Sequence, residues 1–170
     1  MSSGHMLITI IAFVFLTTVL LNFYRLLANS GDTIANGQDG ILATTLATSY
    51  MEIASGLAFD NVTDTSDIAI RNPSMLSSTL GRESASEDSI YDFNDFDDFN
   101  RWSLEETPNG TTRRYKTTFT VQYVVPGNVE TVSANPTFVK RMDLATWRTF
   151  PPGRTDTLKL SMVMGYFHFD

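Results

Sequence analysis

The chain lacks cysteine, contains only two histidines, and carries no charged side chain from Met1 to Tyr24. The absence of cysteine excludes disulfide bonds and thiolate metal sites, although a chain of 170 residues can bury a core without them. Basic residues are also few, because 12 Lys and Arg stand against 19 Asp and Glu and give a formal net charge of -7. A phosphate partner requires a basic surface, so this composition argues against nucleic acid binding.

Catalytic motifs are missing from the sequence as well. It shows no nucleophile–base pairing and no phosphate-binding loop, and its two histidines, His5 and His168, lie at opposite ends. We therefore expect a protein that is not an enzyme and that needs no cofactor.

The charges that are present are unevenly distributed. Residues 60–106 hold 12 acidic and 3 basic side chains, whereas residues 107–170 hold 4 acidic and 8 basic ones. This pattern is consistent with two solvated surfaces, or with a subunit whose acidic face meets the basic face of a neighbour.

The N-terminal segment is the most apolar part of the chain. Met6–Leu21 is almost continuously apolar, and the uncharged stretch His5–Tyr24 has 20 residues. A helix of that length spans roughly 30 Å, the thickness of bilayer hydrocarbon. A cleaved secretory signal would have Lys or Arg before the apolar run, and residues 1–4 have neither. The sequence therefore favours a retained membrane helix behind a short leader at residues 1–4. Ser2–Met6 also resembles the remnant of an expression tag, which would make Met6 the first native residue.

The helical pattern continues beyond the membrane edge. Apolar residues recur at spacings of three, four and seven between Ile34 and Leu57, which predicts an amphipathic continuation. The sequence thus predicts one helix over residues 5–59, on the order of 80 Å long. Each glycine in a helix interior costs up to about 1 kcal/mol, so we expect a kink or a melted turn within Ser30–Gly40. The glycines concerned are Gly31, Gly37 and Gly40.

Residues 60–170 have the composition of a separate β domain. Asp60–Ser89 is polar and predicts a loop, whereas Arg114–Val125 alternates apolar and polar side chains, as a strand with one solvated face does. Thr137–Trp147 is a second strand candidate. Thr157–Phe169 is a third, apolar on both faces and therefore expected to be central or covered by a helix.

These elements predict an α+β fold in which a long N-terminal α-helix packs on an antiparallel β-meander. Short connections favour antiparallel neighbours. A sheet with one apolar face needs cover, and the second half of the helix is the only amphipathic element that can supply it.

This layout resembles the type IV pilin superfamily. Gly4 is similar to the glycine that precedes the prepilin-peptidase cut, and Asp95–Trp102 resembles an acidic–aromatic segment of many minor pilin-like proteins. Lys140–Trp147 and Asp156–Ser161 resemble the last two strands of such proteins.

The resemblance implies processing between Gly4 and His5 by a prepilin peptidase. It also implies that the subunit is held in the inner membrane before assembly. Assembly machinery would then build a helical homopolymer, an extracellular filament at the cell surface. The filament core would consist of Met6, Leu7, Ile8, Thr9, Ile11, Phe13, Phe15, Leu16, Leu20 and Leu21.

The chain departs from the family at two positions. The family usually has Phe where this chain has His5, and Glu where it has Thr9. That Glu is thought to neutralise the N-terminal amine of a neighbouring subunit, and an unpaired amine in hydrocarbon costs several kcal/mol. The Thr9 hydroxyl or the His5 imidazole would offset only part of this cost.

Two other hypotheses remain open. A minor pilin, or a secretion-system pseudopilin, would share the fold and act in priming or at the tip. A membrane-anchored β domain that binds a ligand is the alternative from another class.

The acidic–aromatic run, Tyr91–Trp102, raises one further question, that of Ca²⁺, which prefers oxygen ligands. The spacing does not match an EF-hand, so we expect no metal and assign the run to a loop that Phe93, Phe96 and Phe99 pin onto the sheet or a neighbour. The weak Ca²⁺ candidates are Asp92, Asp95, Asp97 and Asp98.

Overall fold

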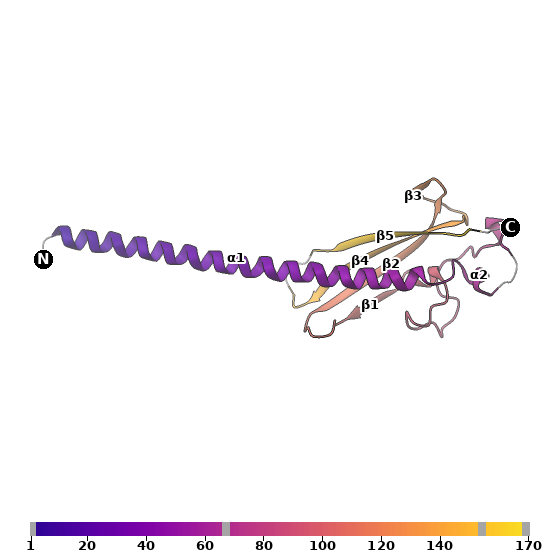
Figure 1. Cartoon of the computed structure of the whole chain (residues 1–170), viewed down its shortest axis with the longest axis horizontal. Helices are drawn as coiled ribbons and strands as arrows, with labels where there is room; N and C mark the ends of the chain where they lie inside the picture. Colours follow the sequence, from indigo (N-terminus) through magenta and orange to yellow (C-terminus); the bar gives the residue numbers. More distant parts are fainter. Residues whose placement is uncertain (1–2, 66–68, 153–155, 168–170) are drawn as a thin grey trace. The chain divides into compact units, whose positions relative to one another are not determined.

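In the computed structural model the chain forms two compact units, Met1–Asp39 and Gly40–Asp170. The structure describes residues 3–65, 69–152 and 156–167. The first unit consists of the N-terminal part of helix α1 (Ser3–Ser55). The second unit contains the remaining turns of α1 and a β-sheet (Figure 1). The α+β fold expected from the sequence is thus confirmed.

Helix α1 passes through all three glycines without interruption. Gly31, Gly37 and Gly40 have helical backbones, so the melted turn expected at Ser30–Gly40 is wrong. Three dispersed glycines cost less than breaking a row of main-chain hydrogen bonds in mid-helix. The helix ends at Ser55 rather than at residue 59, and the amide of Gly56 donates to the carbonyl of Ile53 at 3.1 Å, which tightens the last turn.

The sheet is antiparallel throughout and has the strand order β1-β2-β4-β5, with the short β3 paired to β2 (Figure 1). The strands are β1 (Ser103–Glu106), β2 (Arg114–Val125), β3 (Asn128–Val132), β4 (Val139–Phe150) and β5 (Leu158–Gly165). Three short helical segments precede them: α2 (Asn61–Thr65), η1 (Pro73–Met75) and η2 (Phe96–Phe99).

The predicted strands correspond to β2, β4 and β5, and the bounds of β2 match the sequence pattern. The sequence missed β1 and β3. β5 is not central, because it pairs only with β4 within the described residues and forms an edge of the sheet. The other expected position, beneath a helix, holds for one face: Leu158, Leu160, Met162 and Met164 pack against the core cluster that includes α1. The side chains of β5 alternate between half-buried and exposed, since Lys159, Ser161 and Val163 share the open face.

The core lies between the sheet and the part of α1 that follows Gly40. Ala47 and Ala54 are completely buried there, and the Tyr50 ring meets the Phe119 ring edge-on at a centroid distance of 5.5 Å. The small alanine side chains allow the helix to approach the sheet closely. Ile41, by contrast, is 70% exposed, so this packing face begins at Ala43.

Side chains of the acidic–aromatic run complete this core. Phe93, Phe96 and Phe99 are buried in the same apolar cluster as Tyr50 and Phe119, which confirms that they pin the run onto the sheet. The run is also tied to the segment that follows α1, because the Phe96 amide donates to the Ala58 carbonyl at 2.9 Å.

Replacement of Ala47 by Leu should disturb this packing. Extra methylene groups in a filled core cost about 1–3 kcal/mol, so Ala47→Leu should lower the thermal unfolding midpoint of the full chain in detergent. Thr48→Leu places the same side chain at the next, exposed position and should leave the midpoint nearly unchanged. Equal midpoints for the two variants would contradict this packing.

Candidate functional site

The apolar segment of α1 exposes its side chains on every side. The nine apolar residues of the expected filament core are 47–71% exposed, and the most apolar window of 18 residues contains no buried side chain. The helix is long and apolar enough to cross a membrane, a property that a membrane anchor and a signal sequence share. All ten expected core residues, including Thr9, therefore lie on one accessible helical surface.

The expected processing site lies on the same helix. Gly4 and His5 are helical and exposed. The Thr9 hydroxyl donates to the His5 carbonyl at 2.8 Å, so its proton is used within the helix. Only the hydroxyl lone pairs remain to accept a hydrogen bond from a neighbour's amine.

The other hydroxyls of the apolar segment are satisfied in the same way. Thr17 donates to the Phe13 carbonyl and Thr18 to the Val14 carbonyl, both at 2.8 Å. A hydroxyl that donates to the carbonyl four residues earlier in the helix has a low desolvation cost in an apolar medium. The segment is therefore compatible with hydrocarbon or with a helical bundle despite its threonines.

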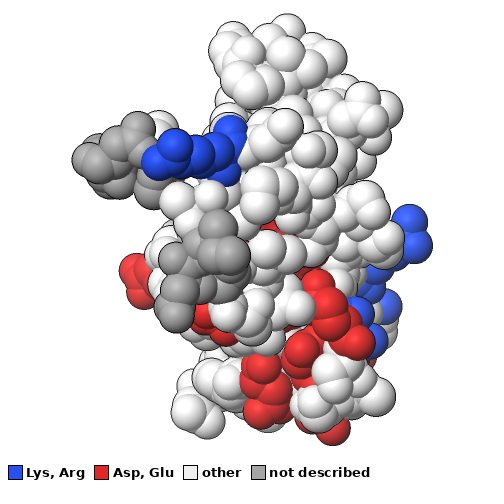
Figure 2. Space-filling view, turned by 90° about the vertical axis from the view of Figure 1, so that its right-hand side faces the viewer, with Lys and Arg blue, Asp and Glu red and all other residues white. Residues whose placement is uncertain are grey.

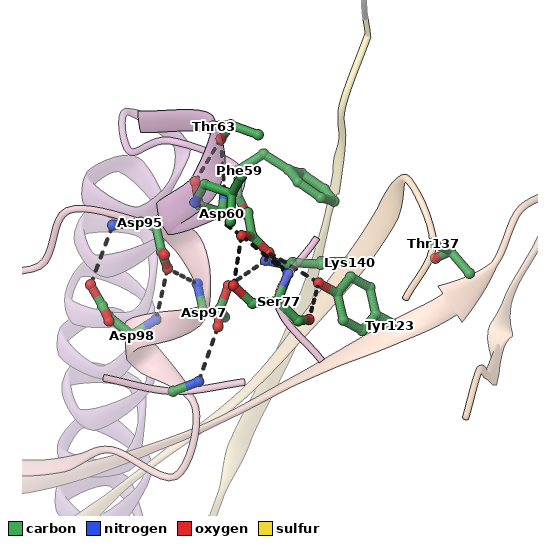
Figure 3. Close-up of polar contacts among 12 residues, drawn as sticks. Phe59, Asp60, Thr63, Ser77, Asp95, Asp97, Asp98, Tyr123, Thr137 and Lys140 are labelled. Carbon is green, nitrogen blue, oxygen red and sulfur yellow. Dashed lines mark hydrogen bonds and ion pairs between the residues drawn. The ribbon is translucent and has the colours of Figure 1, made fainter. Parts of the chain in front are cut away.

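The second unit contains a different feature, a completely buried lysine on β4. The Lys140 ammonium donates to the Phe59 carbonyl at 2.7 Å, to Asp60 Oδ2 at 3.0 Å and to Asp97 Oδ1 (Figure 3). It also lies 4.6 Å from the centre of the Phe59 ring and 5.2 Å from that of Tyr123. One cation thus joins β4 to the segment after α1, to η2 and to β2.

Asp60 is the most heavily bonded acid of this network. Its carboxylate accepts from the Ser77 hydroxyl at 2.8 Å and from the Val62 amide at 3.2 Å, and the Tyr123 hydroxyl lies 3.0 Å from Oδ2. Burial raises the pKa of Asp60, but the charge of Lys140 and these hydrogen bonds outweigh burial, so the pKa lies below its ordinary value. Asp60 is therefore a buried carboxylate held in its charged form.

The four aspartates considered for Ca²⁺ have different surroundings. Asp92 is exposed and lies outside the cluster, and Asp97 is paired with Lys140 and accepts from the Gly81 amide at 3.0 Å. Asp95 and Asp98 form the capping box of η2, and each has a carboxylate oxygen close to one of Glu83. The four do not form a single ligand set.

Sequence reasoning missed Lys140 and Asp60. The alternation of side chains along β4 could have predicted that Lys140 is buried, because it lies two residues before Met142 and four before Leu144, and both of these face the core. A lysine in phase with core residues predicts a buried partner. The partner itself, Asp60, lies 80 residues away and leaves no local pattern.

The outer surface retains part of the charge segregation seen in the sequence. Figure 2 shows Asp and Glu gathered over the lower part of one face, with Lys and Arg in separate groups above and to the right. Lys140 does not contribute to the basic groups, because it is buried.

Comparisons with known proteins add no relative. No protein-family model matches the chain, and no curated protein and no solved structure matches it either.

Removal of the buried cation should destabilise the second unit strongly. Lys140→Met keeps a similar volume but leaves Asp60 and Asp97 buried without a counter-charge, which costs about 3–5 kcal/mol. Thermal unfolding of the full chain in detergent should therefore shift by roughly 10 °C or more. Lys159→Met, at an exposed position of β5, is the matched control and should change little. A stability of Lys140→Met equal to that of the control would contradict the network.

The stability difference between the wild type and Lys140→Met should depend on pH. Because the pKa of Asp60 is lowered in the folded state, its stabilising effect is complete above its unfolded pKa of about 4 and is lost as pH falls through the folded value. Denaturant titrations should show the difference narrowing as pH falls from neutral to below about 4, because the unpaired acids of the variant take up protons at higher pH than those of the wild type do. A constant difference between neutral pH and strong acid would show that the Lys140–Asp60 attraction contributes nothing.

Proposed function

We propose that this chain is a structural subunit of a type IV pilus-like extracellular filament that polymerises through its N-terminal helix. The exposed apolar surface of Met6–Leu21 carries this proposal. A surface apolar on all sides is unstable in water and requires either lipid or other helices around it. The resemblance of the sequence to type IV pilins favours helices of identical subunits.

The energetics support assembly on leaving the membrane. At roughly 25 cal/mol per Å², burial of a helix of this size is worth tens of kcal/mol before the costs of association. An interface between different faces of identical helices is heterologous, so it propagates into a filament rather than closing. The folded second unit has its own core and is available to coat such a filament.

The departure at Thr9 bears on how such a filament would form. A neighbour's N-terminal amine would meet a hydroxyl rather than a carboxylate at this position, and that hydroxyl already donates within its own helix. An uncharged or methylated amine fits this environment better than a charged one. Processing after Gly4 by a prepilin peptidase remains part of the proposal.

Filaments sheared from cells that produce the chain test the proposal. Negative-stain microscopy should show filaments, and mass spectrometry should find this chain in them, beginning at His5. Leu16→Asp should abolish the filaments, because an aspartate in the middle of an apolar helix costs roughly 2.5–3.5 kcal/mol per subunit. Val132→Asp alters an exposed apolar residue of β3 and should leave them intact.

Other outcomes separate the competing hypotheses. A blot of the membrane fraction shows whether the Leu16→Asp chain is made and inserted. Filaments that persist with inserted Leu16→Asp subunits would refute the helical core. A wild-type chain found only in the membrane would instead favour an anchored β domain. Trace amounts in filaments built of another subunit would indicate a minor pilin or pseudopilin.

A further inference from the structure

The capping box of η2 leaves two buried carboxylate oxygens unexplained. Asp95 Oδ1 accepts from the amides of Asp97 and Asp98 at 2.8 and 3.3 Å, and Asp98 Oδ2 accepts from those of Asn94 and Asp95 at 3.0 and 3.3 Å. These bonds account for one oxygen of each side chain. Among the described residues, Asp95 Oδ2 and Asp98 Oδ1 have no hydrogen-bond partner, although both side chains are fully buried.

A third carboxylate lies beside these two. One oxygen each of Glu83, Asp95 and Asp98 lie within 4.8 Å of one another. Glu83 is exposed and reaches the group from the segment before Glu87. The amide oxygen of Asn94, on the same turn, is also buried and without a donor in the described structure. The turn therefore concentrates oxygen atoms that lack positive partners.

Lys140 offsets the negative charge on Asp95 only in part. The Lys140 ammonium is already shared by Asp60, Asp97 and the Phe59 carbonyl. None of the ion pairs found within the described part of the chain includes Glu83, Asp95 or Asp98. Burial, together with the charges of Asp97 and Asp98, raises the pKa of Asp95 to about 8, and burial raises that of Asp98 as well. The carboxylates thus repel one another unless a proton or a cation lies between them.

We propose that Glu83, Asp95 and Asp98 bind a Ca²⁺ ion. Ca²⁺ prefers oxygen ligands at about 2.3–2.6 Å, so it can join oxygens up to about 5 Å apart, and the three carboxylate oxygens meet this limit. Mg²⁺ requires shorter and more regular coordination. The set contains no nitrogen or sulfur ligand, which disfavours zinc and copper.

Of the three carboxylates, only Glu83 lines an open cavity of about 440 Å³, which residues 79–85 and 100–102 enclose. Water in this cavity can coordinate an ion from the Glu83 side. An ion held there would tie the loop that carries Glu83 to η2, and η2 is already held against the sheet by Phe96 and Phe99.

Calorimetry and thermal unfolding of the full chain in detergent test the site. After removal of divalent ions with a chelator, Ca²⁺ should bind with one ion per chain and a Kd between roughly micromolar and millimolar. Saturating Ca²⁺ should raise the unfolding midpoint by several degrees. Mg²⁺ should do so less, and NaCl at matched ionic strength should not reproduce the shift.

Matched variants assign the ion to these residues. Glu83→Gln changes only an exposed side chain outside the capping box and should weaken Ca²⁺ binding at least about tenfold. Asp95→Asn keeps an oxygen for the cap and should abolish binding. Asp92→Asn removes an exposed acid from the same run and should leave the Kd unchanged.

Three results would overturn the site. The first is the absence of both heat and a midpoint shift at millimolar Ca²⁺. The second is equal Ca²⁺ affinity in Glu83→Gln and Asp92→Asn. The third is a midpoint shift that NaCl at the same ionic strength reproduces. That result would mean screening of surface charge, and a proton shared between Asp95 and Asp98 would then relieve their repulsion.

Discussion

The folded unit depends on the environment of one buried ammonium group. Lys140 has no solvent-exposed surface, so its charge is tolerated only where carboxylates and a carbonyl surround it. Those groups come from the segment after α1 and from η2, and Tyr123 of β2 bonds the same acid, Asp60. Because these segments are far apart in the sequence, the charge requirement selects one arrangement of them. Contact between apolar surfaces alone would tolerate several arrangements of these segments.

The acidic–aromatic run meets this requirement and creates a second one. Its phenylalanines fill the core under α1, and this packing forces the aspartates between them into the interior. Asp97 finds Lys140, whereas Asp95 and Asp98 cap η2 with one oxygen each and leave the other unpaired. The buried charged residues of the described structure are five acids and one base. Natural proteins rarely keep such an excess of buried negative charge without a compensating proton or ion. This turn therefore anchors the run to the core and also contains carboxylate oxygens without a partner among the described residues.

The two units differ in whether they bury their own apolar side chains. Residues 40–170 bury their own apolar groups and need no partner for that purpose, whereas the apolar side chains of Met6–Leu21 are all exposed. The stability of the N-terminal segment must therefore come from its surroundings, either lipid or other helices. The internal hydrogen bonds of Thr9, Thr17 and Thr18 make the segment suitable for both. A pilin-like subunit that moves from membrane to filament would use this dual compatibility.

By itself the sequence determined the features that local periodicity encodes: the long helix, the bounds of β2, and the anchoring role of Phe93, Phe96 and Phe99. Each depends on neighbours within a few residues, so spacing alone records it. Only the tertiary structure decided that β5 is an edge strand, that Lys140 is buried against Asp60, and that Glu83 joins Asp95 and Asp98 while Asp92 stays outside. These outcomes depend on which distant segments meet. An aspartate at a turn looks the same in the sequence whether it faces water, a lysine or another carboxylate.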